Sequence, residues 1–352
     1  MDVEDTLILA AMQLDTHPQS LGIDVHAHVV PSTFPAWLGA GATPPAWPSM
    51  APAHACHCHV MIDGKVYRTV SQKCWDVAER LADLGEMGLR AQALSPMPEL
   101  LSYWMSASQA GPLIRYLNEE IARMSAESSG RLVGLGAVPL QDVDAAIDEL
   151  RYVMDSLSFA GVEIGSNVNG VPIGDWRFDP FFEACEALGA AVFVHALKPT
   201  GMDRLVGPAP LQQVLAYPTD VGLAAASCIT TNLMVRFPRL RIAFSHGGGT
   251  LATLLPRLEQ GWQTFPALKD SVRPSPAEQA RKLYYDTLVF DALTLRHLVA
   301  SLGASQLMVG TDYPFNFHDR TPIQRIASAG LGADVVDALI YHNAERFLGL
   351  ET

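Results

Sequence analysis

The chain has few basic residues for its length. Its 352 residues include 24 Lys and Arg against 37 Asp and Glu, so the formal net charge is −13. An acidic surface repels nucleic acid and anionic membranes, and we expect neither as a partner. An anionic substrate would therefore need a local group of Arg or Lys side chains to bind.

Cysteine and long apolar runs are also scarce. The five cysteines are an odd number at low density, which indicates a reducing compartment without a disulfide framework. Every apolar run is shorter than the roughly 20 residues that a membrane-spanning helix needs. Residues 1–17 carry acids but no Lys or Arg, unlike a signal peptide, so we interpret them as an ordered lead-in or a short helix. Together these features predict a cytoplasmic protein.

What the sequence does contain is an alternation of short apolar runs with helix-compatible segments. Runs of this kind suit strands that are buried on both faces, as in a parallel sheet. Helical spacing is found in four of the segments between them, at residues 74–87, 142–157, 180–188 and 219–237. Eight strand–helix units favour an α/β fold of the (β/α)₈ TIM barrel type as a single domain over residues 1–352, although periodicity alone leaves a doubly wound sheet open. The eight runs are Gly22–Val25, Leu89–Leu94, Arg131–Val138, Gly161–Ile164, Ala191–Val194, Arg241–Phe244, Leu283–Thr287 and Gln306–Val309.

Two long segments interrupt this pattern. Residues 31–73 form an insertion, which we predict to be a long loop followed by a small hairpin with its turn at Asp63 and Gly64. Residues 196–218 are rich in Pro and Gly and predict a second loop. Each follows a strand that ends in His, so in a barrel both lie over the C-terminal face, where active sites form.

The strongest local signal is the His-Ala-His sequence after the first run. Alternate side chains of a strand share a face, so His26 and His28 point the same way, as two ligands of one metal ion do. Two half-buried histidines at a strand end are the alternative interpretation.

Three more ionisable residues follow apolar runs, at His195, His246 and Asp312. Burying such groups unpaired is costly, and the strand ends of a barrel meet in one ring. We therefore expect these residues to converge with the two earlier histidines. Imidazole and carboxylate suit zinc, with manganese or cobalt as alternatives.

Two other patterns resemble binding motifs. The glycines Gly247–Gly249 lack the Lys of a phosphate-binding loop, so we expect them to let the backbone pass close to the metal. The cluster of His and Cys over residues 54–59 fits no common zinc spacing. We expect it to be a solvated loop near the mouth of the site rather than a second metal centre.

The order of these motifs resembles the amidohydrolase superfamily, whose members carry the His-X-His pair, two further His and an Asp on the same strands. Within this superfamily, the chain resembles the 2-amino-3-carboxymuconate-6-semialdehyde decarboxylase branch. The resemblance lies in the segments GKVYRTVSQKCWD, RLVGLGAVPLQD, GVEIGSNVN, FSHGGG, GTDYPF and HNAERFLGL. The match extends from about Gly22 almost to the end of the chain. It implies a zinc-dependent carboxy-lyase that takes part in aromatic compound catabolism and uses no organic cofactor.

The resemblance also implies roles for particular residues. It makes His26, His28, His195 and Asp312 the metal ligands, and His246 the group that moves a proton. It assigns Arg68 to the binding of a small anionic carboxylate substrate. It assigns Arg257 to the site of a neighbouring subunit, so a homodimer would be the active form. From the residues alone, Arg68 and Arg257 would be interpreted as surface charges. Arg does, however, pair well with carboxylates.

The sequence departs from the family pattern where it should face the substrate. The fifth-strand His is followed by Ala196-Leu197-Lys198-Pro199, and the eighth-strand Asp by an unusual Asn316-Phe317-His318. Phe315 and His318 are candidates for substrate contact, although His318 alone would pass for a loop histidine. We therefore expect the substrate to be a carboxylated muconate semialdehyde, another ring-cleavage product or an aromatic acid.

Two other functions remain open at this point. The same metal would serve a hydrolase or hydratase acting on a related carboxylic acid. A scaffold protein without activity would be expected to have lost ligands, yet all four are present.

Overall fold

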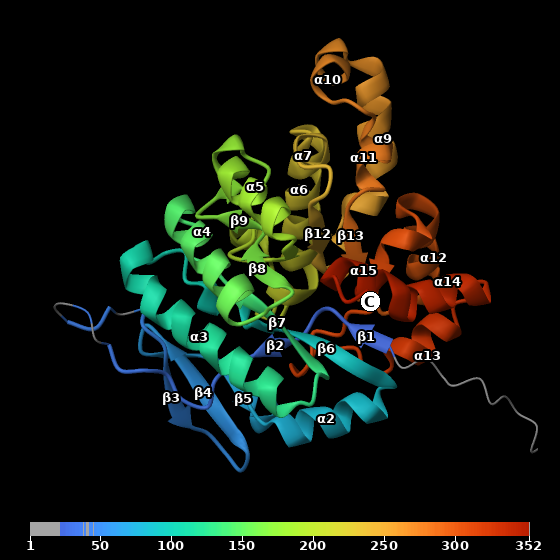
Figure 1. The fold of residues 1–352 in the computed structure, drawn as a ribbon. Helices are drawn as coiled ribbons and strands as arrows, with labels where there is room; N and C mark the ends of the chain where they lie inside the picture. Colours follow the sequence, from blue (N-terminus) through green and yellow to red (C-terminus); the bar gives the residue numbers. More distant parts are fainter. Residues whose placement is uncertain (1–21, 38, 40–41, 45, 352) are drawn as a thin grey trace, which may run out of the picture.

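Eight parallel strands form the centre of the structure, and they are hydrogen-bonded in the order in which they follow one another along the chain (Figure 1). The computed structural model describes residues 22–37, 39, 42–44 and 46–351, so the lead-in expected at residues 1–17 lies outside the described residues. All eight predicted runs contain a strand. They are β1 (Gly22–Asp24), β6 (Leu89–Pro96), β7 (Leu132–Ala137), β8 (Gly161–Gly165), β11 (Ala191–His195), β12 (Arg241–Phe244), β13 (Tyr284–Asp286) and β14 (Leu307–Met308).

The first and last strands close the sheet into a barrel. The Val25 amide donates to the carbonyl of Val309 over 2.9 Å, and the His28 amide donates to the carbonyl of Tyr313 over 2.7 Å. Parallel bridges join the same segments. A short strand, β2 (His28–Val29), also pairs with the end of β6. The closed barrel is confirmed, and the doubly wound alternative is excluded.

Helices surround the barrel, and several begin at a residue that caps them. The side chains of Asp76, Asp142 and Asp291 each accept a hydrogen bond from a backbone amide three residues later. The helices outside the barrel are α2 (Val77–Glu86), α3 (Ala107–Glu127), α4 (Val143–Arg151), α5 (Asp179–Leu188), α6 (Tyr217–Thr230), α7 (Leu233–Arg236), α9 (Leu251–Thr264), α10 (Pro266–Ser271), α11 (Pro276–Ala280), α12 (Ala292–Leu302), α13 (Pro322–Ala327), α14 (Ala333–Asp337) and α15 (Asn343–Leu348).

The four predicted helices are present, with one correction. The segment 219–237 is not one helix, because Asn232 adopts a left-handed conformation with φ 57° and separates α6 from α7. The chain also turns helical before residue 219, through a short π-helix at Gln212–Ala216. The loop predicted over residues 196–218 is therefore shorter than expected.

The barrel interior is filled by side chains and is not a pore. Ile23, Val25 and Phe193 belong to a buried cluster to which the last helix, α15, also contributes. The Phe347 ring of α15 lies 5.5 Å from the Tyr284 ring at the start of β13. With its interior packed and the N-terminal ends of the strands covered, the barrel leaves its C-terminal end for a site.

The insertion at residues 31–73 contains more regular structure than predicted. It forms an antiparallel sheet of β3 (Ser49–Pro52), β4 (His57–Ile62) and β5 (Lys65–Ser71). The hairpin turn at Asp63 and Gly64 is confirmed, and both residues have positive φ. The prediction of a loop up to residue 59 is wrong, because residues 49–52 pair with residues 58–61 and gain backbone hydrogen bonds that the Pro-rich composition did not suggest.

Two expectations about the whole chain can be compared with the structure. All five cysteines are free thiols in the structure. Among the described residues, no helix combines the length and the apolar character that a bilayer crossing requires.

Candidate metal centre and substrate cavity

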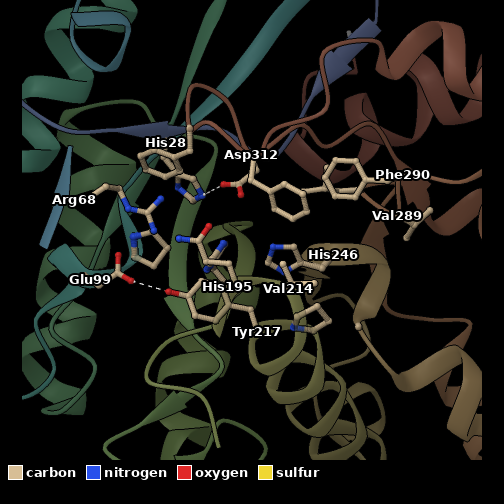
Figure 2. Close-up of a pocket in the computed structure, with 17 residues that line it drawn as sticks. His28, Arg68, Glu99, His195, Val214, Tyr217, His246, Val289, Phe290 and Asp312 are labelled. Carbon is tan, nitrogen blue, oxygen red and sulfur yellow. Dashed lines mark hydrogen bonds and ion pairs between the residues drawn. The ribbon is translucent and has the colours of Figure 1, made fainter. Parts of the chain in front are cut away.

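Side chains from three strand ends meet at the C-terminal end of the barrel. His26 and His28 follow β1, His195 is the last residue of β11, and Asp312 follows β14. One ligand atom from each of these residues lies within 4.8 Å of the other three. Figure 2 shows His28, His195 and Asp312 pointing toward one another. The predicted convergence of these four side chains is therefore present in the fold.

The hydrogen bonds of the three imidazoles leave one nitrogen of each for the centre of the group. The Nδ1 atom of His26 lies 2.7 Å from Asp286, that of His28 lies 3.2 Å from the Pro96 carbonyl, and that of His195 lies 2.9 Å from the Ala196 carbonyl. When Nδ1 carries the proton, Nε2 presents a lone pair. The arrangement is the one that metal-bound histidines adopt.

The distances across the group fit a divalent cation. The Nε2 atoms of His26 and His28 are 3.2 Å apart, and the latter is 3.1 Å from Asp312 Oδ1. The Nε2 atom of His195 is buried and has no hydrogen-bond partner among the described residues. Facing lone pairs at such distances repel unless a cation lies between them. Ligands at about 2.0–2.2 Å from zinc stand roughly 3.3 Å apart, so the donor set fits this ion or one like it.

For three of the four ligands, burial and neighbouring charges favour the protonation state that binds a metal. Burial lowers the pKa of His28 and lowers that of His195 well below its usual range. Burial alone would raise the pKa of Asp312, but its hydrogen bond to His28 and the neighbouring imidazoles hold it below its usual value. Neutral imidazole and ionised carboxylate are the forms that bind divalent ions.

Asp286 orients two parts of the site and was not predicted. It lies at the end of β13, is fully buried, and accepts a hydrogen bond from His26 Nδ1. Burial opposes the charged form of His26, but the hydrogen bond to Asp286 and its charge outweigh burial and raise the pKa of His26 to about 9. The backbone amides of His246 and Gly247 also donate to Asp286, over 2.9 Å and 2.7 Å. An acid within the apolar run Leu283–Thr287 was the available signal.

A second buried network holds the His-Ala-His segment in place. Asp24 accepts hydrogen bonds from the His26 amide at 3.0 Å and from the Gln92 amide group at 2.7 Å. The Arg80 guanidinium, which is fully buried, donates to Gln92 and to the carbonyl of His28, each over 2.7 Å. These bonds fix the backbone on both sides of the two histidines. Sequence reasoning did not identify Asp24, Gln92 or Arg80.

His246 stands beside the metal ligands on a strained turn. Its φ is 54°, in the left-handed region that few residues other than Gly adopt. Its ring centroid lies 5.1 Å from that of His195 and 5.3 Å from that of His26. Burial, together with the charge of His26, lowers the pKa of His246 to about 4. The imidazole is therefore neutral near pH 7 and can accept a proton.

The glycines after His246 allow the chain to pass close to neighbouring segments, whereas the expectation of a close approach to the metal stays a prediction. Gly247, Gly248 and Gly249 all have positive φ. A Cβ atom on Gly249 would lie 1.8 Å from the carbonyl oxygen of Pro218. Only glycine fits this turn, which delivers His246 to the cavity.

A cavity of about 270 Å³ opens over the metal-ligand group. Three of the four proposed ligands and His246 lie in its wall, so a bound molecule would contact the metal-ligand group and His246 together. Much of the remaining wall is apolar, which suits an unsaturated or aromatic molecule. The lining residues are His28, Arg68, Pro98, Glu99, His195, Gln213, Val214, Tyr217, Pro218, His246, Gly249, Leu288, Val289, Phe290, Asp312, Phe315 and Phe317.

The structure places two of the four predicted substrate residues in the cavity and two outside it. Arg68 and Phe315 line the cavity, with the guanidinium 4.2 Å from the centre of the phenyl ring. His318 lies in a neighbouring hollow, where its ring packs against Tyr313 at 5.6 Å. Arg257 is exposed on α9 and does not line the cavity of its own chain. Glu99 and Tyr217, which do line it, were not predicted and lie outside any periodic pattern.

The His and Cys cluster at residues 54–59 is separate from the metal centre. His57, Cys58 and His59 lie on β4 rather than in the expected loop. Among the described residues, only the four side chains at the barrel end form a group that could hold a metal ion. Residues 56 and 57 instead line the hollow that contains His318.

Comparison with known proteins agrees with this geometry. The amidohydrolase family matches residues 23–350. A 2-amino-3-carboxymuconate-6-semialdehyde decarboxylase from Dictyostelium discoideum is 36% identical over 95% of this chain and 93% of its own length. The crystal structure of 5-carboxyvanillate decarboxylase from Sphingomonas paucimobilis has a TM-score of 0.72 and 28% identity, over 79% of this chain and 84% of its own.

A dihydroxybenzoic acid decarboxylase from a Polaromonas species, whose structure holds manganese and 2-nitroresorcinol, has a TM-score of 0.68 over 77% of this chain and 85% of its own. At 20% identity, this likeness shows a shared fold. These three similar proteins are carboxy-lyases by name, which agrees with the enzyme class that the sequence predicted. The chain belongs to the amidohydrolase family, in the branch that includes the 2-amino-3-carboxymuconate-6-semialdehyde decarboxylases.

Proposed function

We propose that the protein is a metal-dependent, non-oxidative decarboxylase of a carboxylated muconate semialdehyde or a similar ring-cleavage or aromatic acid. The observation that carries this proposal is the position of the cavity. Its lining contains His28, His195 and Asp312, whose ligand atoms lie close to one another, and also Arg68. Membership of a branch whose named relatives are decarboxylases supports the reaction class.

His26, His28, His195 and Asp312 would hold the ion. Three imidazoles and one carboxylate suit zinc, and we propose it as the native metal, with manganese or cobalt as alternatives. When bound, the ion acts as a Lewis acid that polarises an oxygen of the substrate.

The chain's own residues bind the substrate and move the proton. The Arg68 guanidinium pairs with a substrate carboxylate, and the Phe315 ring beneath it offers an apolar face. The bond between the substrate carbon and its carboxylate breaks, and the electron pair stays on that carbon. His246 accepts a proton from water or from the substrate and passes it to the carbon, while carbon dioxide leaves. No oxidant or organic cofactor is consumed.

Two further parts of the proposal concern the assembly. Arg257 lies on the outer surface of α9, so it would reach a substrate only in a second copy of the chain. We therefore propose a homodimer in which each subunit contributes Arg257 to its partner. The cytoplasmic location stays a prediction.

The reaction class is tested by analysing the products. Purified protein loaded with zinc, manganese or cobalt would be incubated with 2-amino-3-carboxymuconate semialdehyde and with a panel of hydroxybenzoic acids. We expect release of carbon dioxide and a product smaller by that molecule. A product that has instead gained water would identify a hydrolase or hydratase and contradict the proposal.

A further inference from the structure

A carboxylate at the cavity wall has one oxygen in use and one free. Glu99 lies in a short helical turn, Pro98–Leu101, that follows β6, and only 9% of its surface is exposed. Its Oε1 atom accepts hydrogen bonds from the hydroxyl of Tyr67 and, over 3.1 Å, from that of Tyr217. Its Oε2 atom is buried and has no partner among the described residues. An unpartnered carboxylate oxygen is costly to bury, so this one is suited to a ligand.

The two tyrosines that donate to Glu99 Oε1 come from different parts of the chain. Tyr217 is the first residue of α6, whereas Tyr67 comes from β5 of the insertion sheet. The pairing of β4 with β5 shifts at Val60 and Met61, which leaves Tyr67 as the extra residue of a β-bulge next to Arg68. Such bulges redirect side chains near active sites. Burial first, and the charge of Glu99 second, raise the pKa values of both hydroxyls, so they remain donors.

Arg68 lies near Glu99 but does not pair with it. The Oε2 atom of Glu99 has no hydrogen-bond partner among the described residues, and the Arg68 guanidinium instead lies over the Phe315 ring. Burial alone would lower the pKa of Arg68, but the charge of Glu99 contributes to raising it. This end of the cavity therefore offers a cation and an acceptor side by side, as Figure 2 shows. The pair is complementary to a carboxylate with a hydrogen-bond donor near it, whereas Glu99 would repel a second carboxylate.

We propose that Glu99 is a specificity-determining residue whose Oε2 atom accepts a hydrogen bond from a hydroxyl or amino group of the substrate. The substrate class is then an unsaturated or aromatic acid that presents one carboxylate to Arg68 and a donor to Glu99. This assignment rests on the proposed function only in taking the cavity as the substrate site.

Ligand binding tests the inference without relying on turnover. The dissociation constants of benzoate and of 2-, 3- and 4-hydroxybenzoate would be measured by calorimetry with metal-loaded protein. In the wild type, we expect at least one hydroxybenzoate to bind roughly tenfold more tightly than benzoate, since a hydrogen bond to a charged acceptor has an effect of this size. If no isomer binds more tightly than benzoate, the inference is overturned.

The Glu99→Gln variant separates recognition from a structural role. It keeps the size of the side chain but removes its charge, so the advantage of the hydroxybenzoate should fall at least about fivefold. Benzoate itself should bind as well as before or more tightly, because the negative charge beside Arg68 is gone. Equal weakening of both ligands, or an unchanged advantage, would contradict the inference.

Two controls complete the design. Glu183 is exposed on α5, away from the cavity, so Glu183→Gln makes the same charge change and should leave all four affinities unchanged. Tyr217→Phe removes a donor to Oε1 but leaves Oε2 in place, so it should reduce the hydroxybenzoate advantage less than Glu99→Gln does. If the protein decarboxylates no acid but Glu99→Gln still changes the binding ratio, the proposed reaction fails while the role of Glu99 stands.

Discussion

The metal-ligand group and the substrate end of the cavity are built in different ways. His26, His28 and His195 are almost completely buried, and the hydrogen bond at the Nδ1 atom of each imidazole orients its ring. Arg68 and Tyr67 come from an added sheet, and Tyr67 is 38% exposed. The first region is therefore fixed by the barrel, whereas the second depends on a sheet inserted after the first strand. Common chemistry is expected from the first and substrate choice from the second.

Removing a metal ligand should have the largest effect. His195→Ala deletes an imidazole whose Nε2 atom has no other partner, and a metal contributes several kcal/mol to the transition state. We expect kcat/KM to fall on the order of 10³-fold or more. The measurement is steady-state decarboxylation, with chelator-treated wild type as the matched control. Full activity in either sample would refute a metal-dependent reaction.

Replacing the proton-transfer residue should come next. His246→Ala should lower kcat by about 10²- to 10⁴-fold, the range found for general acid–base residues. The metal content, measured on the same preparation, should be unchanged, because His246 lies beside the ligands rather than among them. Turnover at the wild-type rate would remove His246 from the mechanism.

Replacing Asp286, which orients the ligand His26, should cause a smaller loss, in metal affinity. Asp286→Asn weakens the hydrogen bond that orients His26, and changes of this kind cost roughly 10- to 100-fold in metal affinity. Competition with a chromogenic chelator would measure it. An unchanged affinity would show that Asp286 only supports the backbone amides of the neighbouring turn.

Substitutions of Arg68, at the substrate end of the cavity, should change KM more than kcat. Arg68→Met keeps much of the stem over Phe315 but removes the charge, so KM should rise by about 10- to 100-fold with a smaller change in kcat. Arg68→Lys, which cannot form a bidentate pair, should fall between this variant and the wild type. If kcat falls while KM stays constant, Arg68 does not anchor the substrate.

Complementation tests the role of Arg257. Neither Arg257→Ala nor His246→Ala should be active alone. If the arginine acts across the dimer, mixed subunits restore one intact site in half of the dimers and about a quarter of the wild-type activity. Native electrophoresis would confirm subunit exchange. Restoration far below this level after full exchange would mean that Arg257 serves its own chain or none.

The same division explains how much was predictable from the sequence. His26, His28, His195 and Asp312 follow apolar runs, and a closed barrel brings the ends of its strands together whatever the sequence between them. The strands and the ligand group therefore followed from periodicity and residue type. Asp286 offered the same signal, an acid within an apolar run, which was not used.

The substrate end had no comparable signal. Glu99 lies in a single helical turn, and its partners Tyr67 and Tyr217 are 32 and 118 residues away in the sequence. The bulge that places Tyr67 beside Arg68 depends on the register of β4 and β5, which the composition of the insertion does not reveal.

Helix α3 could have been predicted, but it was not. Its buried residues have helical spacing in the sequence, at Leu113, Leu117, Ile121 and Met124.

The most direct test is the metal stoichiometry of the protein. Chelator-treated wild type would be dialysed against zinc, manganese or cobalt and analysed by mass spectrometry, beside His195→Ala and Asp312→Ala. Four converging side chains predict one tightly bound ion per chain in the wild type and its loss in both variants. No bound ion in the wild type, or one ion retained by both variants, would contradict a metal centre at the end of the barrel.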